Sequence, residues 1–167
     1  MIFVLVYTMK QDGSSLPHNH TPIQVLLADD DSDDRIFFAR MLSELSIPTQ
    51  LTTVENGELL MIYLSEKHDK LPDIVFVDLN MPKKNGIECL SEIKNNEKLK
   101  LLPVIIISTS VHEDAADLIY NGGAHYYVRK TDITELKKNL HLVLTLLAKN
   151  KFSRPTRSNF VLSLAGA

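Results

Sequence analysis

Short apolar runs alternate along this chain with longer segments in which apolar residues recur at helical spacing. The longer segments are typical of amphipathic helices; in the first of them, Ile36, Ala39 and Leu42 mark one face. The short runs are rich in β-branched and aromatic residues, which predicts five buried strands, at 22–28, 50–56, 72–80, 102–108 and 123–130. A strand-then-helix unit repeated five times predicts a parallel sheet with helices on both faces.

Local signals mark where several helices begin and end. Pro48 stops the first helix, because proline has no amide hydrogen and clashes with the preceding turn. Ser110 and Glu113 form an S-x-x-E capping pattern before the fourth helix, and Asp132 and Glu135 form a related pattern before the fifth.

We expect one domain over residues 22–148, with an N-terminal tail (1–21) and a C-terminal tail (149–167). The first ten residues are apolar, but no basic residue precedes the run and no small-residue cleavage site follows it, so we do not expect a signal peptide. The last segment is polar, basic and too short for a second domain.

Composition narrows the class of protein. The net charge of −3 offers no attraction to nucleic acid or to an anionic membrane. The single cysteine, Cys89, excludes an internal disulfide and favours a reducing compartment. No apolar stretch approaches the length that crosses a bilayer. We therefore expect a cytoplasmic globular protein.

Polar side chains stand where the predicted strands end. The residues concerned close the first, third, fourth and fifth strands in turn: Asp29 and Asp30, Asp78, Ser108 and Thr109, and Lys130. In open α/β sheets, ligands bind outside the carboxyl ends of the strands, where the strand order reverses. Residues distant along the chain are therefore expected to meet in one small cleft.

The chemistry of such a cleft points to a divalent cation. Carboxylates within about 4 Å of each other repel by several kcal/mol at intermediate dielectric, and Mg²⁺, which prefers oxygen ligands, removes that conflict. Asp30 and Asp78 suit this ion, with a backbone carbonyl just past Asp78 as a third ligand. An aspartate beside the metal can attack a phosphoryl group; Lys130 would neutralise phosphoryl charge, and Ser108 would donate a hydrogen bond.

Four motifs in this order carry a resemblance to a known family: "LLADDD", "VFVDLNMPKKNG", "VIIISTS" and "YYVRK". Together they resemble the receiver domain of bacterial two-component response regulators. The single-domain kind is the most similar, such as the chemotaxis regulator and the small regulators paired with phytochrome-type kinases. The resemblance covers about residues 22–148. It implies a flavodoxin-like, doubly wound (βα)5 three-layer sandwich with a parallel five-stranded sheet in the order 2-1-3-4-5.

The resemblance also implies roles for individual residues. Asp78 would be the phosphoacceptor, with Asp30 binding Mg²⁺ directly and Asp29 through water. Asn80 would offer its backbone carbonyl to the metal, and Lys130 would bind the phosphoryl group. The remaining residues with implied roles are the loop-shaping Pro82 and Gly86, the switch hydroxyl Ser108 and the rotating aromatic Tyr127.

One residue departs from the family pattern. The family usually has proline after the phosphate-binding lysine, often in a cis peptide bond, whereas this chain has Thr131. Because a non-proline cis bond is unfavourable by about 2.5–4 kcal/mol, we expect a trans bond and an altered loop.

The resemblance implies a signalling phosphoacceptor rather than an enzyme, with slow autodephosphorylation at most. A sensor histidine kinase or phosphotransfer protein would phosphorylate Asp78, Ser108 would move toward the phosphate, and Tyr127 would turn inward. Because no output domain follows, the signal would pass to a separate output protein, which the sequence does not name, or through a homodimer. Neither nucleic acid nor a membrane is an expected partner.

Other interpretations fit parts of the pattern. In a purely structural one, Asp31 or Ser32 caps the helix, and Asp33 and Asp34 lie in its first turn. A haloacid-dehalogenase-type phosphohydrolase would place its nucleophile on the first strand, with a second aspartate two residues later, and "DLN" at 78–80 fits neither condition. A flavin carrier would need a hydroxyl- and glycine-rich loop after the first strand. A receiver-like module that binds partners without phosphorylation is a further alternative, which Thr131 leaves open.

Overall fold

The computed structural model describes residues 5–8, 21–66, 70–109, 112–130 and 132–162. In this part of the chain, one sheet of seven strands has the order β1-β3-β2-β4-β5-β6-β7. Its strands are β1 (Leu5–Thr8), β2 (Ile23–Ala28), β3 (Thr49–Val54), β4 (Ile74–Asp78), β5 (Val104–Ser108), β6 (Tyr126–Arg129) and β7 (Val161–Leu162). The helices are α1 (Ser32–Ser43), α2 (Gly57–Glu66), α3 (Gly86–Asn95), α4 (Glu113–Asn121), α5 (Ile133–Ala148) and the short 3₁₀ helix η1 (Arg157–Asn159).

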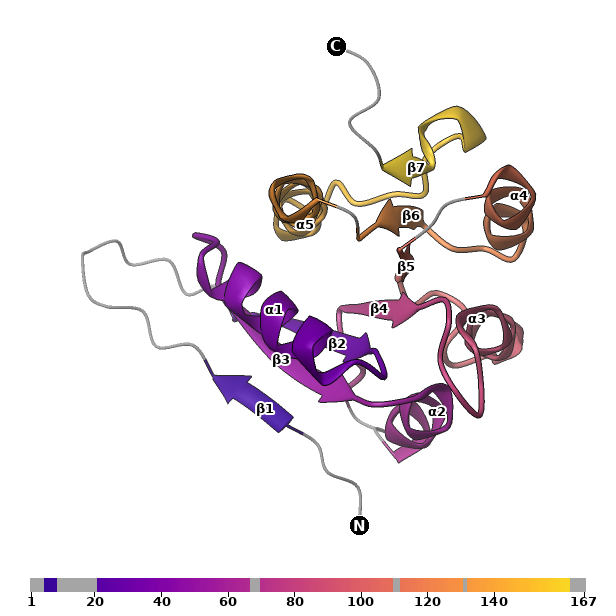
Figure 1. The fold of residues 1–167 in the computed structure, drawn as a ribbon, viewed down its shortest axis with the longest axis horizontal. Coiled ribbons are helices and arrows are strands. Elements are labelled where there is room, and N and C mark those ends of the chain that lie inside the picture. Colours follow the sequence, from indigo (N-terminus) through magenta and orange to yellow (C-terminus); the bar gives the residue numbers. More distant parts are fainter. Residues whose placement is uncertain (1–4, 9–20, 67–69, 110–111, 131, 163–167) are drawn as a thin grey trace.

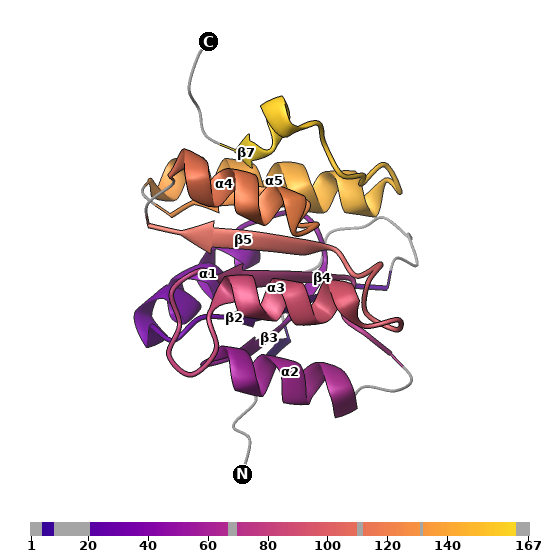
Figure 2. The same ribbon diagram turned by 90° about the vertical axis from the view of Figure 1, so that its right-hand side faces the viewer.

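The central five strands confirm the predicted topology. They are parallel and lie in the order β3-β2-β4-β5-β6, which is 2-1-3-4-5 when these five are counted along the chain. Helices α1 and α5 cover one face of the sheet, and α2, α3 and α4 cover the other (Figure 1). Figure 2 shows α4, α3 and α2 one above another, each running alongside the strands. The strand order reverses beside β2 and β4, so the predicted cleft lies at their carboxyl ends.

Both edges of the sheet extend beyond the five predicted strands. Strand β1 pairs antiparallel with β3, within the segment expected to be an N-terminal tail. Strand β7 pairs parallel with β6, within the segment expected to be a C-terminal tail. Over residues 149–162 that segment therefore packs on the domain, and its Phe160 is fully buried. Strand β7 has two residues and follows a polar stretch, so no apolar periodicity predicts it. Strand β1 lies in the apolar first ten residues, which were expected to belong to a tail.

The apolar side chains fill two layers, one on each face of the sheet. The layer under α1 and α5 includes Phe38 and Phe76, whose rings meet edge to face at 5.1 Å between centroids. The layer under α2, α3 and α4 includes Tyr127 and Phe160. Ile36, which marks the predicted apolar face of the first helix, is instead more than half exposed, as are Leu118 of α4 and Ile133 of α5.

Capping explains several helix starts. Asp31 is the N-cap of α1, where its side chain accepts hydrogen bonds from the backbone of Asp33 and Asp34. Asp132 caps α5 by accepting from the Glu135 amide at 3.0 Å. Helix α4 starts after His112, which makes no side-chain capping bond, and the predicted cap Ser110 lies outside the described residues. In the described part of the chain, no helix has the length and apolar character that crossing a membrane demands.

Candidate functional site

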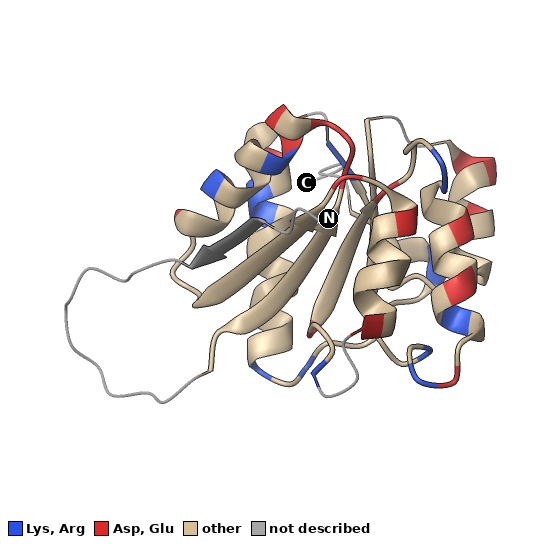
Figure 3. Ribbon diagram, turned by 90° about the horizontal axis from the view of Figure 1, so that it is seen from below, with Lys and Arg blue, Asp and Glu red and all other residues tan. Residues whose placement is uncertain are grey.

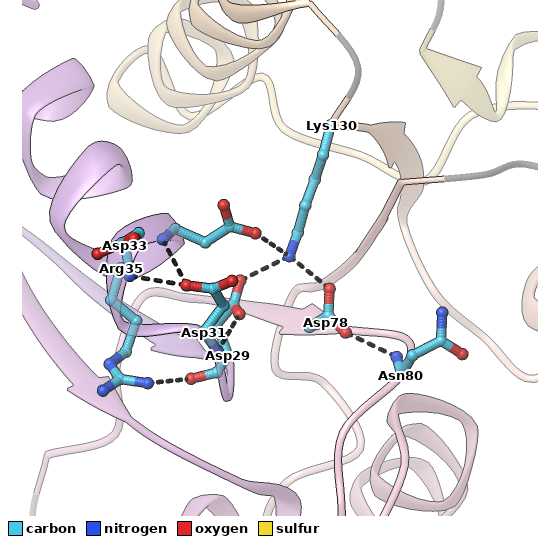
Figure 4. A network of polar contacts seen from close by, with 8 residues as sticks. Asp29, Asp31, Asp33, Arg35, Asp78, Asn80 and Lys130 are labelled. Atoms are coloured by element: carbon cyan, nitrogen blue, oxygen red, sulfur yellow. Dashed lines mark hydrogen bonds and ion pairs between the residues drawn. The ribbon is translucent and has the colours of Figure 1, made fainter.

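Lys130 joins acidic residues from two separate parts of the chain (Figure 4). Its ammonium nitrogen lies 2.7 Å from Asp29 Oδ2, 2.5 Å from Asp78 Oδ1 and 2.9 Å from Asp34 Oδ2. The side chain of Lys130 is only 9% exposed, and those of Asp29 and Asp78 are 2% and 8% exposed. Figure 3 shows acidic residues in the loops beyond one end of the strands and along the helices beside the sheet.

The parallel register of the sheet brings these residues together. Strands β2 and β4 are aligned so that Ala28 pairs with Val77, which places Asp29 and Asp78 side by side at the carboxyl ends. The backbone amide of Lys130 donates to the Ser108 carbonyl at 2.8 Å and anchors the end of β6 to the end of β5. The predicted convergence of distant residues is therefore observed for Asp29, Asp78 and Lys130.

The carboxylate of Asp78 is held at both of its oxygens. While Oδ1 pairs with Lys130, Oδ2 accepts a hydrogen bond from the backbone amide of Asn80 at 2.7 Å. Because Asp78 is the last residue of β4 and is buried, its backbone is fixed by the sheet. A carboxylate oriented in this way is suited to a reaction that needs one defined direction of attack.

Negatively charged groups outnumber positively charged ones in this site. Burial raises the pKa of Asp29 to about 6, although the hydrogen bond and charge of Lys130 oppose the rise. Burial also lowers the pKa of Lys130, but the hydrogen bonds and charges of Asp29 and Asp78 outweigh this effect, so its pKa is raised and it stays protonated. Three carboxylates face one ammonium group, which leaves room for a second cation.

The donor atoms fit a magnesium ion in part. The oxygens of Asp29 and Asp78 that contact Lys130 lie within 2.7 Å of one nitrogen, so one small cation can reach both. Among the described residues, no three or more His, Cys, Asp or Glu side chains are grouped as metal ligands. Mg²⁺ usually needs only one or two carboxylates and completes its shell with water and carbonyl oxygens.

The structure does not bring every predicted ligand into this network. The side chain of Asp30 is exposed and makes no hydrogen bond or ion pair with the described residues, so its direct contact with a metal stays a prediction. Asn80 is exposed beside Asp78, where its carbonyl remains a candidate ligand. Thr131 lies outside the described residues.

Ser108 and Tyr127 form a second, buried part of the site. Ser108 ends β5 at 1% exposure, and Tyr127 on β6 is fully buried. Burial raises the pKa of the Tyr127 phenol, and a hydrogen bond with the Ser108 side chain opposes that rise. Tyr127 therefore already has the inward position that the family resemblance implies only after phosphorylation.

Two contributors were missed by reasoning from the sequence. Asp34, assigned to the helix start alone, also pairs with Lys130, because the first turn of α1 faces the cleft. Arg35 donates to the Asp29 carbonyl at 2.6 Å and holds the loop after β2. Their positions six and seven residues after the end of β2 at Ala28 were the available signal, since the first turn of the following helix lies over the same cleft.

The loop beyond Asp78 passes close to the strand it leaves. Gly86 donates its amide to the Leu79 carbonyl at 3.0 Å, and a Cβ added at Gly86 would lie 2.6 Å from the Asp78 carbonyl oxygen. Pro82 is exposed, and its carbonyl accepts from the Lys84 amide at 2.8 Å. Glycine at position 86 thus lets this loop return to β4.

Gly86→Ala is therefore expected to destabilise the protein by about 1–3 kcal/mol, because the strand backbone cannot move aside. Urea unfolding measures the change. The matched control is Ser91→Ala on the exposed side of the same helix, which is expected to change the free energy of unfolding by about 0.5 kcal/mol or less. Equal effects of the two substitutions would contradict the close approach at Gly86.

Fold and site together define a class: an open, doubly wound α/β protein with a carboxylate–lysine cluster at the carboxyl ends of its strands. Within this class, the family model of the response regulator receiver domain matches residues 25–141. The chain therefore belongs to the response regulator receiver family.

Individual relatives agree with this assignment. Response regulator Rcp1 of Synechocystis sp. is 31% identical over 117 residues, which cover 68% of this chain and 80% of Rcp1. The crystal structure of the phosphorylated cyanobacterial phytochrome response regulator RcpA has a TM-score of 0.71 at 28% identity, and covers 81% of this chain and 100% of RcpA. The Mn(2+)-bound form of Rcp1 has a TM-score of 0.69 at 28% identity, over 81% of this chain and 100% of that one.

The comparisons confirm the receiver fold and the assignment to two-component signalling. The phosphohydrolase, the flavin carrier and the phosphorylation-independent module are not favoured.

Proposed function

We propose that this chain is a single-domain response regulator whose Asp78 accepts a phosphoryl group from a sensor histidine kinase or a phosphotransfer protein. The observation that carries the proposal is the buried contact of 2.5 Å between Asp78 and Lys130 at the carboxyl end of the sheet. It gives one carboxylate a fixed direction and a cation beside it, in a family that signals by phosphorylation.

The transfer is a displacement at phosphorus. A carboxylate oxygen of Asp78 attacks the phosphorus of a phosphohistidine, the new P–O bond forms, and the P–N bond breaks with imidazole as the leaving group. Charge on the transferred group is met by the Lys130 ammonium, which has three donors and now contacts three carboxylates. Asp34, the most exposed of the three at 44%, is the partner most easily replaced by a phosphoryl oxygen.

Magnesium is the proposed cofactor. Asp30 and Asp78 would hold it, with the Asn80 carbonyl as a further ligand and Asp29 acting through water. When bound, the ion would offset negative charge on the carboxylates and on the phosphoryl oxygens. The relative Rcp1, which has been crystallised in a Mn(2+)-bound form, supports a divalent cation as the cofactor.

Mass spectrometry of the intact chain after incubation with acetyl phosphate and Mg²⁺ tests the proposal. We expect the gain of one phosphoryl group, which is lost in Asp78→Asn and lost without Mg²⁺. The matched control is Asp73→Asn, an exposed aspartate at the opposite end of β4, which should be phosphorylated like the wild type. Phosphate retained in Asp78→Asn, or repeated turnover of a phosphomonoester, would overturn the assignment.

The metal ligands are tested in the same assay. Asp30→Asn is expected to raise the Mg²⁺ concentration needed for phosphorylation by about 10-fold or more, since one charged ligand is removed. Asp33→Asn is the control, because Asp33 is an exposed aspartate of the same run, in the first turn of α1. An unchanged Mg²⁺ requirement in Asp30→Asn would remove Asp30 from the metal site.

A further inference from the structure

Residues 149–162, here called the strap, follow α5 and return to the sheet. The strap ends in β7, which lies beside β6 between α4 and α5 (Figure 1). It begins after residue 141, the last residue that the receiver family model matches.

We propose that the strap holds Tyr127 in its inward position and thereby couples the α4–β6–α5 face to phosphorylation of Asp78. Tyr127 links the strap to the phosphorylation site, because it contacts the strap on one side and Ser108 on the other. The inference rests on the proposed function, because it assigns a structural consequence to the same phosphorylation.

Phe160 anchors the strap. Its side chain is fully buried and packs against the equally buried Tyr127, with ring centroids 6.5 Å apart. It also meets Tyr120 of α4 edge to face at 5.1 Å. The amide of Tyr127 donates to the Phe160 carbonyl at 3.0 Å, so both the ring and the backbone of Tyr127 are fixed by one residue of the strap.

Polar contacts fasten the strap to α4. Arg157 pairs with Asp117 at 2.6 Å and with Glu113 at 2.9 Å. Arg154 donates to the Ala124 carbonyl at 3.0 Å, and its guanidinium carbon lies 4.0 Å from the centre of the Tyr120 ring. The strap is thus attached to the helix beside Phe160, as well as to the sheet edge.

A further contact reaches α5. The side-chain amide of Asn139, which is buried, donates to the Leu162 carbonyl at 3.3 Å. With α4, β6 and α5 all in contact with the strap, any movement of Tyr127 outward has to displace Phe160 or detach β7.

Ser108 connects this arrangement to the phosphoryl site. A hydroxyl group has one donor and two acceptor positions, so Ser108 can accept from the Tyr127 phenol and donate to a phosphoryl oxygen on Asp78. Phosphorylation therefore favours the inward Tyr127, and the inward Tyr127 favours the attached strap. Because coupling between two sites is reciprocal, phosphorylation should tighten the strap.

Amide hydrogen exchange of the full chain, followed by NMR, tests this coupling. The reporter is the amide of Tyr127, which is bonded to the strap, and the reference is the amide of Val75, which donates to Pro103 within the core. In the wild type, phosphorylation by acetyl phosphate and Mg²⁺ is expected to slow exchange at Tyr127 by about 5-fold or more. Val75 should not change by that factor.

Two substitutions in the strap provide the comparison. Phe160→Ala is expected to speed exchange at Tyr127 by about 10-fold or more and to abolish its response to phosphorylation. Phe152→Ala removes a ring of the same size that stacks on His125 and meets Tyr126 instead, and should preserve the response. If Phe160→Ala also speeds exchange at Val75, the milder Phe160→Leu replaces it.

The outcomes separate the two proposals. Phosphorylated wild type with unchanged exchange at Tyr127 would overturn the coupling and leave the proposed function intact. A wild type that mass spectrometry shows to be unphosphorylated would overturn the proposed function and, with it, the coupling. Equal effects of Phe160→Ala and Phe152→Ala on Tyr127 would overturn the role of Phe160 in holding it.

Discussion

Lys130→Met is expected to lower the free energy of unfolding by about 3–5 kcal/mol at about pH 8 when divalent cations are absent, because it leaves buried carboxylates without their counter-charge. The side chain it removes is 9% exposed and contacts three carboxylates. Methionine has a similar length and no charge, so the change tests electrostatics rather than packing. Urea unfolding in the presence of a chelator measures it.

Two further measurements show whether the loss of stability in Lys130→Met is electrostatic. At about pH 5 the loss should be smaller, because Asp29, whose pKa burial already raises to about 6, takes up a proton. Added Mg²⁺ should restore part of the stability by binding the folded state. The control is Lys137→Met, which removes a half-buried lysine that pairs with Glu44 at the surface and should have little effect. A loss that is the same at both pH values and in Mg²⁺ would indicate a packing defect instead.

Asp29→Asn is expected to have the opposite effect and to raise the free energy of unfolding at about pH 7.5 by about 1–3 kcal/mol. The buried carboxylate of Asp29 is ionised at this pH at the expense of stability, and the neutral amide removes that penalty. Lys130 keeps Asp78 and Asp34 as partners in the variant.

The sign of the pH dependence follows from the raised pKa. An aspartate carboxyl ordinarily has a pKa of 3.8, whereas the pKa of Asp29 in the folded protein is about 6, so the folded protein binds more protons than the unfolded chain between these values. The contribution of Asp29 to the stability of the folded protein is therefore most favourable below the unfolded-state pKa, and it is lost as the pH rises through about 6.

The difference in the free energy of unfolding between Asp29→Asn and wild type should therefore increase from about pH 4 to about pH 6 and stay constant at higher pH. Unfolding curves over this range, with a chelator present, measure it. Asp33→Asn, at an exposed position of the same acidic run, should show no such difference. A variant less stable than wild type at about pH 7.5 would contradict the unfavourable burial of Asp29.

The order of the elements could be predicted from the sequence because each strand is a short apolar run and each helix has a separate apolar face. The positions of Asp78 and Lys130 followed from that order, since parallel strands bring their carboxyl ends to one edge. Asp31 as the cap of α1 followed from its place before the helix. These are consequences of local pattern, which a single sequence contains.

The features that escaped prediction depend on contacts between distant residues. The second role of Asp34 requires knowing that the first turn of α1 faces Lys130. The burial of Phe160 requires the gap between α4 and β6 that its ring fills, and its own segment has no periodicity. The exposure of Ile133 reflects its place in the first turn of α5, where only the following turns pack on the sheet.

The two outermost strands of the sheet are very short, with four residues in β1 and two in β7. A long unpaired strand would present a row of free amides and carbonyls to which another chain could add, and very short edge strands are one means by which natural proteins avoid aggregation of this kind. Strands β3 and β6, which would otherwise end the sheet, are each shielded by a neighbour. Contacts between copies of this protein are therefore expected to involve helices rather than a sheet continued from one molecule to the next.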